Sequence, residues 1–334
     1  MIDPHNALIV ISGVAGMTGS LVARKLLDRG YSVIGFDNFF AGSRSDVAAL
    51  KEYSRFTFHE YDINDREEMD RLFKGLDESP RKELHFINCA AVVHTTHFYE
   101  IEATFATNVL AMKDMLTRCI THRFVSYINC STSEVYSMDS YKEGGVREDM
   151  PVLVATAEQS QRTSYAVGKL LTEFMMKDRV AKGLILGCSI RFANVYSPSE
   201  LHDQHIIPHI ITSLMEHDEV TLLEHAKETQ RTFLHNDDSA EAVIALLMTP
   251  SALDGSVYNV GTTEEIAIPH LVEKIGAMLG NPKPRIRYQG SRSADPHRRM
   301  LNCDKLMEAT GWRPKKTLDA GLAECIAYRQ GNRR

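Results

Sequence analysis

Short apolar runs alternate with longer amphipathic stretches through the first 190 residues, and this alternation restricts the possible fold more than any other feature. Helix-like segments such as Gly19–Arg29, Arg66–Leu76 and Ile101–Thr121 separate the apolar runs. Repeated strand–helix–strand units predict an α/β fold with a doubly wound parallel sheet, which binds ligands at the carboxyl ends of its strands. The predicted strands are Leu8–Ile11, Ser32–Phe36, Phe56–Tyr61, Leu84–Asn88, Phe124–Asn129 and Leu184–Arg191.

The regular alternation ends near residue 191. Residues 202–209 and 285–299 are rich in His, Pro, Ser, Arg and Asp, so we expect irregular segments there. Val257–Val260 predicts one more short strand, and Ile268–Leu279 predicts a helix closed by Gly280. We therefore expect a smaller C-terminal lobe that is interleaved with the first part of the chain rather than joined to it by a linker.

Composition excludes several classes of protein. The 334 residues are 43% hydrophobic and 25% charged, which is enough apolar material for a core and excludes disorder. The net charge of -6, without a long basic run, indicates no nucleic-acid or membrane partner, and no apolar stretch approaches the ~18 residues of a membrane span. The apolar stretch Ala7–Met17 lacks a basic leader, and the six cysteines form no C-x-x-C pair, so we expect free thiols and a cytoplasmic protein.

A glycine-rich loop, Gly13-Val-Ala-Gly16-Met17-Thr18-Gly19, joins the first predicted strand to a helix. Glycines there allow backbone N–H groups to approach a pyrophosphate at the helix N-terminus, which is typical of a Rossmann-type dinucleotide site. Asp37-Asn38 ends the second strand, 18 residues after the last glycine, where a carboxylate suits a ribose 2′-hydroxyl and repels a 2′-phosphate. We therefore predict NAD rather than NADP, the alternative being a simple turn with a helix-capping Asp.

Asp62-Ile63 follows the third predicted strand. The Asp62 carboxylate could accept a hydrogen bond from an adenine amino group. It could equally cap the helix that begins near Asp65, so both interpretations stay open.

Tyr165 and Lys169 stand at i and i+4, on one face of a predicted helix. An ammonium group near a phenol lowers its pKa, so a phenolate could act as a base near neutral pH. Ser131-Thr132-Ser133-Glu134 follows a predicted strand, at the edge of the sheet where active-site hydroxyls belong. A capping box ending at Glu134 is the structural alternative, but it leaves the order of the glycine loop, Asp37, the hydroxyl cluster and Y-x-x-x-K unexplained.

In this order the motifs resemble the extended short-chain dehydrogenase/reductase family, in its nucleotide-sugar epimerase, dehydratase and decarboxylase branch, over nearly the whole chain. The resemblance implies a Thr132, Tyr165 and Lys169 triad and a cofactor site. It also implies that Asn194 and Arg299 meet the substrate diphosphate or sugar, that Arg231 meets the nucleoside, and that Ser133 contacts substrate. Ser137 and Ser197 depart from the family pattern, which has glycine at both positions. The implied cofactor residues are Gly13, Gly16, Met17, Thr18, Gly19, Asp37, Asn38, Asp62, Ile63, Cys89, Ala90, Ala91, Asn108, Ser131, Tyr165 and Lys169.

The resemblance implies that Tyr165 removes a proton during oxidation at C4 of the sugar of a nucleotide-diphosphate sugar, with a UDP-sugar favoured. Glu134 then suits a step at C5 or C6, and the position of Arg299 resembles that of a decarboxylase arginine that faces a sugar carboxylate. We expect decarboxylation of a UDP-uronate or 4,6-dehydration of a nucleotide hexose, with 4-epimerisation as the alternative. Ser133 argues modestly against a dTDP-glucose dehydratase.

The resemblance also implies two domains and a homodimer. We expect residues 1–190, with a returning segment about 229–262, to bind NAD, and residues 191–228 and 263–334 to bind the nucleotide sugar. Helices around Ile101–Thr121 and Tyr165–Lys182 would form the dimer interface by analogy. A less favoured alternative reads His94, His97, His202, His205 and His209 as metal ligands, but ligand spacing and Pro208 oppose it, so no metal is expected. A non-catalytic NAD-binding protein is also less favoured, because the triad is intact.

Overall fold

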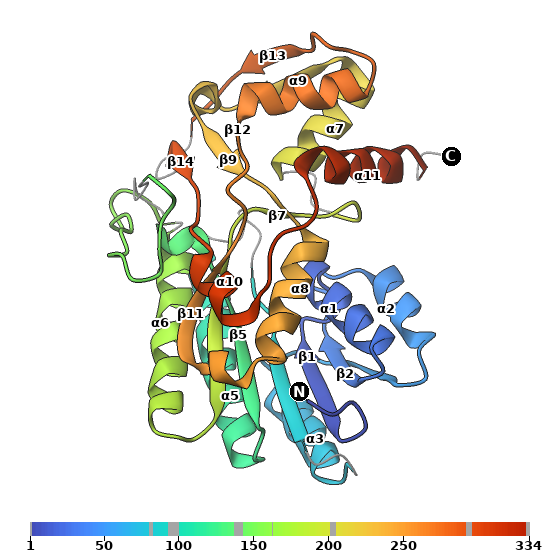
Figure 1. Cartoon of the computed structure of the whole chain (residues 1–334), viewed down its shortest axis with the longest axis vertical. Helices are drawn as coiled ribbons and strands as arrows, with labels where there is room; N and C mark the ends of the chain where they lie inside the picture. The colour runs from blue at the N-terminus through green and yellow to red at the C-terminus, as the bar shows by residue number, and fades with distance from the viewer. Residues whose placement is uncertain are drawn as a thin grey trace.

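The computed structural model describes residues 2–79, 83–92, 100–136, 143–161, 163–200, 205–291 and 296–331. Seven parallel strands form the main sheet in the order β11-β6-β5-β4-β1-β2-β3 (Figure 1). Each overlaps a strand predicted from the sequence, so the doubly wound α/β fold is confirmed. The strands are β1 (Ala7–Ser12), β2 (Ser32–Asp37), β3 (Phe56–Glu60), β4 (Glu83–Asn88), β5 (Ser126–Thr132), β6 (Leu186–Phe192) and β11 (Asp254–Val260).

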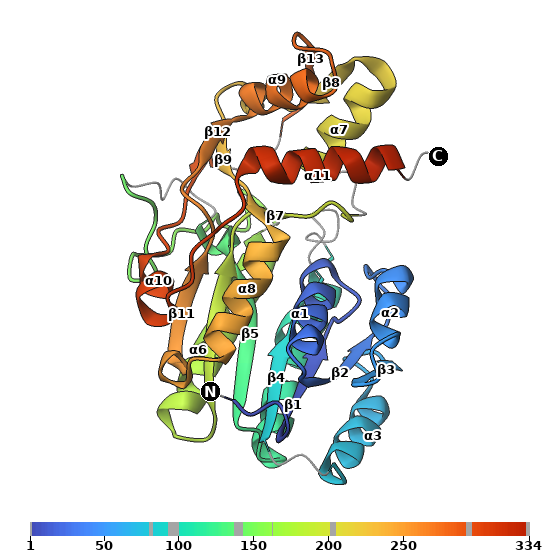
Figure 2. The same ribbon diagram turned by 45° about the vertical axis from the view of Figure 1, so that its right-hand side comes forward.

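Helices cover both faces of this sheet (Figure 2). Alternate residues of β1 point to opposite faces, so Ile9 and Ile11 pack with α1 (Met17–Asp28) and α8 (Asn236–Leu247). Leu8 and Val10 pack on the other face with α3 (Arg66–Asp77) and α5 (Met112–Thr121). The long helix α6 (Thr163–Ala181) lies on this second face too, where its Met176 joins the same core.

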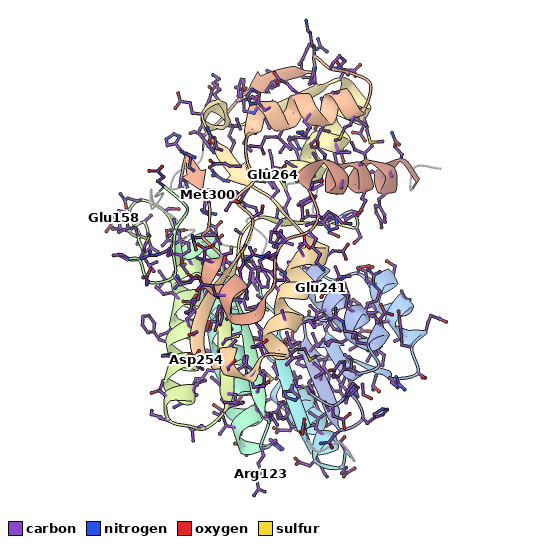
Figure 3. The ribbon with its side chains drawn as sticks, viewed as in Figure 1. Arg123, Glu158, Glu241, Asp254, Glu264 and Met300 are labelled. Atoms are coloured by element: carbon purple, nitrogen blue, oxygen red, sulfur yellow. The ribbon has the colours of Figure 1, made fainter. Side chains whose placement is uncertain are left out.

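Ion pairs join α1 to α8 at the edge of the first core. Glu241 of α8 lies 3.3 Å from Lys25 Nζ and 2.6 Å from Arg29 Nη2 of α1, and Figure 3 shows Glu241 between these helices. The contact fixes a helix from the C-terminal third of the chain against the first helix. The remaining helix on this side is α2 (Arg44–Lys51), whose N-cap is Ser43.

A second core lies above the carboxyl end of the sheet (Figure 1). It joins α7 (Ile206–His217), α9 (Ile268–Met278) and α11 (Leu318–Gly331), and α9 matches the predicted helix Ile268–Leu279. Three small sheets complete this region: β7 with β10, β12-β9-β14, and β8 with β13. Their strands are β7 (Val195–Tyr196), β8 (Glu219–Leu222), β9 (Gln230–Thr232), β10 (Leu234–His235), β12 (Glu265–Ala267), β13 (Arg285–Tyr288) and β14 (Arg298–Arg299), and α10 (Asp304–Thr310) returns to the first core.

The expectation of irregular structure at 202–209 and 285–299 is wrong in part, while residues 202–204 and 292–295 lie outside the described residues. Residues 206–217 form the helix α7. Pro208 does not prevent this, because it is the third residue of the helix, and N–H groups in the first turn make no hydrogen bond within a helix. Arg285–Tyr288 forms β13, because alternating apolar and charged side chains suit a strand with one covered face, and it pairs with β8. Arg298–Arg299 pairs with β9.

The single predicted helix Ile101–Thr121 is divided into α4 (Ile101–Phe105), a π-helical segment η2 (Ala106–Ala111) and α5. Among the described residues, none of the helices combines the length and the apolarity that crossing a membrane would require.

Candidate active site

The glycine loop folds tightly onto the end of the neighbouring strand β4. Gly13 has φ +68°, and a Cβ there would stand 2.6 Å from Ala90 N and 2.7 Å from the Cys89 carbonyl carbon. A Cβ on Gly19 would stand 2.2 Å from the Gly13 oxygen. Gly16 is the N-cap of α1 and supplies no side-chain cap, so the first N–H groups of the helix remain available to a ligand. This cradle fits the pyrophosphate of a dinucleotide.

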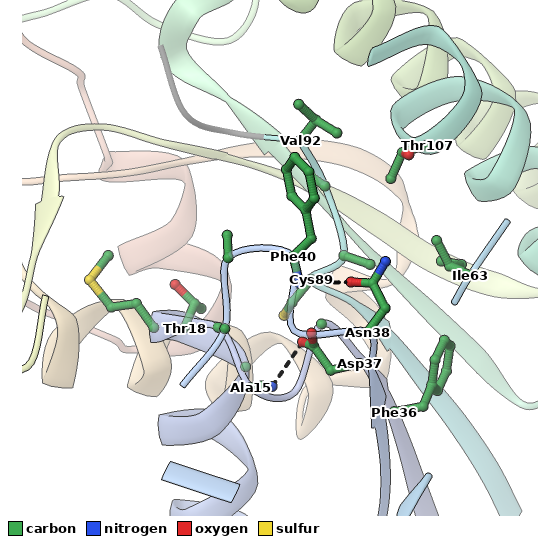
Figure 4. Close-up of a pocket in the computed structure, with 18 of the residues that line it drawn as sticks. Ala15, Thr18, Phe36, Asp37, Asn38, Phe40, Ile63, Cys89, Val92 and Thr107 are labelled. Atoms are coloured by element: carbon green, nitrogen blue, oxygen red, sulfur yellow. Dashed lines mark hydrogen bonds between the residues drawn. The ribbon is translucent and has the colours of Figure 1, made fainter. Parts of the chain in front are cut away.

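A cavity of about 450 Å³ opens beside this loop (Figure 4). Asp37 lies at its base, where its carboxylate accepts hydrogen bonds from Ala15 N at 3.0 Å and Phe39 N at 2.7 Å. Burial raises the pKa of Asp37, and these backbone hydrogen bonds oppose the rise. Twelve of the predicted cofactor residues line the cavity: Gly13, Gly16, Met17, Thr18, Gly19, Asp37, Asn38, Asp62, Ile63, Cys89, Ala90 and Ala91.

Helix capping does not explain the two aspartates that follow β2 and β3. The N-cap of α2 is Ser43, and the N-cap of α3 is Asp65, which accepts from Glu68 N at 3.0 Å. Asp62 instead accepts from Asn38 Nδ2 at 3.0 Å across the mouth of the cavity. Neither aspartate is the N-cap of a helix, and both line the first cavity.

Other predicted cofactor residues support the cavity from behind it. Asn108, in the π-helical segment, is buried, accepts from Val92 N at 2.8 Å and donates to Val92 O at 3.1 Å. Asn108 therefore fixes the backbone at Val92, directly after Ala90 and Ala91. Asn108 itself is not among the described residues that line the first cavity. Ser131 is also buried, and its hydroxyl donates to Glu173 Oε1 at 2.6 Å.

A second cavity of about 550 Å³ lies between the carboxyl edge of the sheet and the second core. Thr132, Glu134, Tyr165, Asn194, Arg231 and Arg299 all line it, whereas Ser133 is buried and is not among its lining residues. Lys169, one helical turn after Tyr165, is buried and donates from Nζ to Cys130 O at 2.7 Å. Burial lowers the pKa of Lys169. Two members of the predicted triad, Thr132 and Tyr165, therefore line the second cavity, and Lys169 is buried one helical turn after Tyr165.

An ion pair crosses this cavity. Arg299 Nη1 donates to Glu134 Oε1 at 2.7 Å, and the Arg299 side chain is only 4% exposed. Its Nε and Nη2 atoms are buried and have no hydrogen-bond partner within the described part of the chain. The Arg299 guanidinium group therefore keeps two buried donor atoms unpaired, and such donors are unfavourable until an acceptor reaches them.

The remaining predicted substrate residues are held by backbone contacts. Asn194, at φ +39°, donates from Nδ2 to Thr232 O at 3.0 Å. Arg231 donates from Nη1 to Gln230 O at 2.8 Å and to His297 O at 3.1 Å. Asn194 and Arg231 therefore line the second cavity and also link neighbouring backbone segments of its wall by hydrogen bonds. Ser197 is buried, its hydroxyl 3.3 Å from that of Ser199, and Ser137 lies outside the described residues.

A buried charge cluster beneath the triad escaped the sequence analysis. Glu173 and Arg191 form an ion pair at 2.6 Å, with both side chains about 95% buried. Arg191 Nη1 also donates to the Tyr136 hydroxyl, and Glu173 accepts from Ser131 as described above. The available signal was the spacing of Tyr165, Lys169 and Glu173, which puts all three on one helix face.

Several further lining residues were also missed. Phe40 to Ser43 complete the first cavity, and His225, Phe233 and Gln289 extend the second into the upper lobe. Glu200 and His205 line both cavities, and the His205 ring contacts the Glu200 carboxylate. Phe40 to Ser43 follow the predicted strand β2 but carry no motif of their own. The other residues lie beside strands of two to four residues, which are too short to leave a periodic pattern.

The histidines considered as metal ligands make other contacts. His205 pairs with Glu200, and His209 Nε2 lies 2.9 Å from Thr221 O, while His94, His97 and His202 lie outside the described residues. A separate group, His235, Asp237 and Glu324, brings its possible ligand atoms within 4.8 Å of one another. Lys316 Nζ already pairs with both carboxylates of that group, at 3.3 Å and 2.6 Å, so a cation already occupies its centre.

Comparisons with known proteins agree with this geometry. The chain is 27% identical to UDP-glucuronic acid decarboxylase 1 of Arabidopsis thaliana over 96% of this chain and 69% of that protein. It is also 27% identical to dTDP-glucose 4,6-dehydratase of Streptomyces griseus, over 96% and 93% respectively. The structure of UDP-glucose 4-epimerase from Thermotoga maritima with UDP-glucose superposes with a TM-score of 0.86 at 23% identity, covering 98% of this chain and all of that one.

The family model described as the NAD dependent epimerase/dehydratase family matches residues 9–261, which include every described residue that lines the first cavity and the predicted triad. Part of the wall of the second cavity, including Arg299, lies beyond this range. NAD is the cofactor of that family, and the glycine cradle, Asp37 and the first cavity fit it. The chain belongs to the NAD dependent epimerase/dehydratase family.

Proposed function

We propose that this protein oxidises C4 of a nucleotide-diphosphate sugar and then breaks a bond at C5 or C6, with decarboxylation of a UDP-uronate as the leading reaction. NAD, when bound in the first cavity, supplies the hydride acceptor. Tyr165 takes the proton of the C4 hydroxyl, Thr132 holds that hydroxyl, and Lys169 favours the ionised phenol by its charge. Support comes from Thr132 and Tyr165, which both line the second cavity, and from Lys169, which lies one helical turn after Tyr165 and is buried.

The observation that carries the choice of reaction is Arg299. Arg299 lines the second cavity, and its unpaired Nε and Nη2 atoms could donate to a substrate carboxylate. Its Nη1 atom holds Glu134 in the same cavity. Once C4 is a ketone, a C6 carboxylate is a β-keto acid: the C5–C6 bond breaks, CO2 leaves, and the electron pair passes into the C4–C5 enolate. Glu134, which Arg299 holds in the same cavity, is the carboxyl group that would return a proton to C5.

The same cavity supports 4,6-dehydration as the second candidate, because the Glu134 carboxylate could equally remove the C5 proton. The similarity to a dTDP-glucose 4,6-dehydratase favours this reaction to the same extent as the similarity to the decarboxylase. The C6 carboxylate of a uronate can accept hydrogen bonds from Arg299, whereas a neutral hexose has no charged group there. For this reason we place decarboxylation first.

The test is incubation with NAD and a panel of UDP-glucuronate, UDP-glucose and dTDP-glucose, with products read by mass. Loss of CO2 from UDP-glucuronate supports the proposal, and loss of water from a hexose supports dehydration instead. A product of unchanged mass with altered retention indicates 4-epimerisation. Absence of any product from the whole panel would contradict a nucleotide-sugar enzyme.

We also propose that the two lobes divide the ligands, with residues 1–190 and the returning segment 229–262 holding NAD and residues 191–228 and 263–334 holding the nucleotide sugar. The position of the second cavity between the sheet and the second core supports this division. The six free cysteines suit a reducing compartment, which supports a cytoplasmic protein.

A homodimer completes the proposal. The neighbouring elements α4, η2 and α6 expose large apolar side chains, namely Ile101, Phe105, Leu110, Val167, Leu171 and Phe174, the last of them 66% exposed. Such a patch on adjacent helices is typical of a helix–helix interface between subunits. Sedimentation should give a dimer, and Phe174→Glu should shift it toward the monomer; a wild-type monomer at micromolar concentration would contradict the interface.

A further inference from the structure

Two cysteines from neighbouring strands meet beneath the cofactor cavity. Cys89 directly follows β4, Cys130 lies in β5, and the two strands are paired in parallel with Asn88 opposite Asn129. The next residues along both strands are these cysteines, and their sulfur atoms lie 3.7 Å apart. Adjacent parallel strands are about 4.8 Å apart, within the range of Cα separations that disulfides bridge.

The surroundings of this pair differ from those of the other four cysteines. Lys169 donates to the Cys130 carbonyl oxygen, so a cation lies beside the pair. The hydrogen bond from Cys89 and the charge of Lys169 lower the pKa of the Cys130 thiol. By contrast, burial raises the pKa of Cys303 and Cys325 to about 12, and it raises those of Cys119 and Cys188 as well.

Access to the pair runs through the first cavity. Cys89 is half-buried and lines that cavity, as Figure 4 shows. Cys130 is 9% exposed and lies behind it. A small solute can therefore approach the pair from the Cys89 side, through the space that NAD fills when bound.

We propose that Cys89 and Cys130 form a modification site at which hydrogen peroxide generates a reversible disulfide, and that bound NAD protects this site. The proposal rests on the sulfur–sulfur contact, on Lys169 beside it and on the position of Cys89 in the cavity wall. It concerns the chain's thiols and does not depend on which sugar reaction the enzyme performs.

The chemistry balances with peroxide as the oxidant. The Cys130 thiolate attacks one peroxide oxygen, the O–O bond breaks, and Cys130 becomes a sulfenic acid as hydroxide leaves and takes up the thiol proton. The Cys89 thiol then attacks the sulfenic sulfur, the S–S bond forms, and a second water leaves. Two thiols and one peroxide thus give one disulfide and two waters, and a dithiol reductant reverses the change.

Oxidation would disturb both halves of the site. An S–S bond is about 2.05 Å long, so the sulfurs must approach and the two strand ends must adjust. The Cys130 carbonyl oxygen holds Lys169, and the Cys89 backbone packs against Gly13, where even a Cβ has no room. We therefore expect the oxidised protein to bind NAD more weakly.

The experiment treats the purified protein with hydrogen peroxide, with and without added NAD, and maps the products by peptide mass spectrometry. We expect a linked Cys89–Cys130 peptide that a dithiol removes. At an NAD concentration about 100 times Kd, mass action leaves about 1% of the protein free, so oxidation should slow about 100-fold. A rate of oxidation that NAD does not change would overturn the protected location.

Single variants test the direction of the reaction. In Cys89→Ser, a dimedone-type probe should trap sulfenic acid at Cys130, whereas Cys130→Ser should leave Cys89 largely unlabelled. Cys325→Ser, which removes a buried thiol outside the pair, is the matched control and should still form the linked peptide. The proposal is overturned if no linked peptide forms in the wild type, or if it forms between other cysteines. Because every readout is a peptide mass, failure here is distinguishable from failure of the proposed sugar chemistry.

Discussion

Glu134→Gln separates the two chemical steps of the proposed reaction. The substitution keeps the size of the side chain and an oxygen that can accept from Arg299, but it removes the charge and the ability to hold a proton. In the structure this replaces an ion pair of 2.7 Å by a hydrogen bond from the almost fully buried Arg299 guanidinium to a neutral amide oxygen, on a side chain that is 19% exposed. The loss of stability should be about 1–2 kcal/mol, because hydrogen bonds to charged groups exceed neutral ones by that order.

The expected loss in catalysis is larger. Removing one general acid–base group typically slows a step by about 10²- to 10⁴-fold, equivalent to about 3–5 kcal/mol of barrier. The variant should therefore remain folded, because a domain of ordinary stability tolerates the smaller loss. The first oxidation, which depends on Tyr165, should continue, and the decarboxylated or dehydrated product should fail to appear.

The assay combines rapid-scan absorbance of the reduced cofactor with the mass of the product. The matched control is Glu265→Gln. Glu265 pairs with Arg298, the neighbour of Arg299 on β14, but Glu265 does not line the second cavity. Glu265→Gln should lower stability modestly and leave the product unchanged. A wild-type rate of product formation in Glu134→Gln would refute the role of this carboxylate, and a change within about tenfold would favour 4-epimerisation.

Three further predictions follow from the described contacts. Tyr165→Phe should lower turnover about 10²- to 10⁴-fold while NAD titration stays close to wild type, and near-normal activity would identify another base. NADP should bind at least about tenfold more weakly than NAD, because the Asp37 carboxylate in the first cavity would repel a 2′-phosphate, and Asp37→Asn should bring the two dissociation constants closer together; equal wild-type affinities would contradict the assignment. Glu173→Gln leaves Arg191 buried without its counter-charge, so chemical denaturation should show about 3–5 kcal/mol less stability, and an unchanged midpoint would show that this pair contributes nothing.

The sequence predicted the parts of the fold whose signal is local. Apolar runs such as Leu8–Ile11 and Ser32–Phe36 identified strands, and their alternation with helices gave the parallel sheet. The glycine loop and Asp37 belong to one continuous β–α–β segment, so both could be placed at the same cavity before the structure was known.

Features that depend on distant residues could not be predicted. Glu134 and Arg299 are 165 positions apart, and only the folding of the upper lobe over the sheet brings them to 2.7 Å. Arg191 is only 18 positions from Glu173, but it lies on a strand and Glu173 on a helix, so the ion pair depends on how α6 packs against β6. In α7, the histidines and Pro208 made a helix look improbable, because the tolerance of the first turn for proline is not visible until the start of the helix is known.

The order in which the chain visits the two hydrophobic cores has a mechanical consequence. The elements β6, α8, β11 and α10 contribute to the first core, and α7, α9 and α11 contribute to the second. Along the sequence the chain therefore passes from the first core to the second three times, at α7, α9 and α11. A single cut therefore cannot release either lobe as an intact piece, and neither can be expressed as one uninterrupted stretch of sequence. Rotation of the upper lobe must bend several connecting segments together, which restricts it to small movements. We expect the lobes to melt in one cooperative transition, and a nick in any one connection to leave them associated.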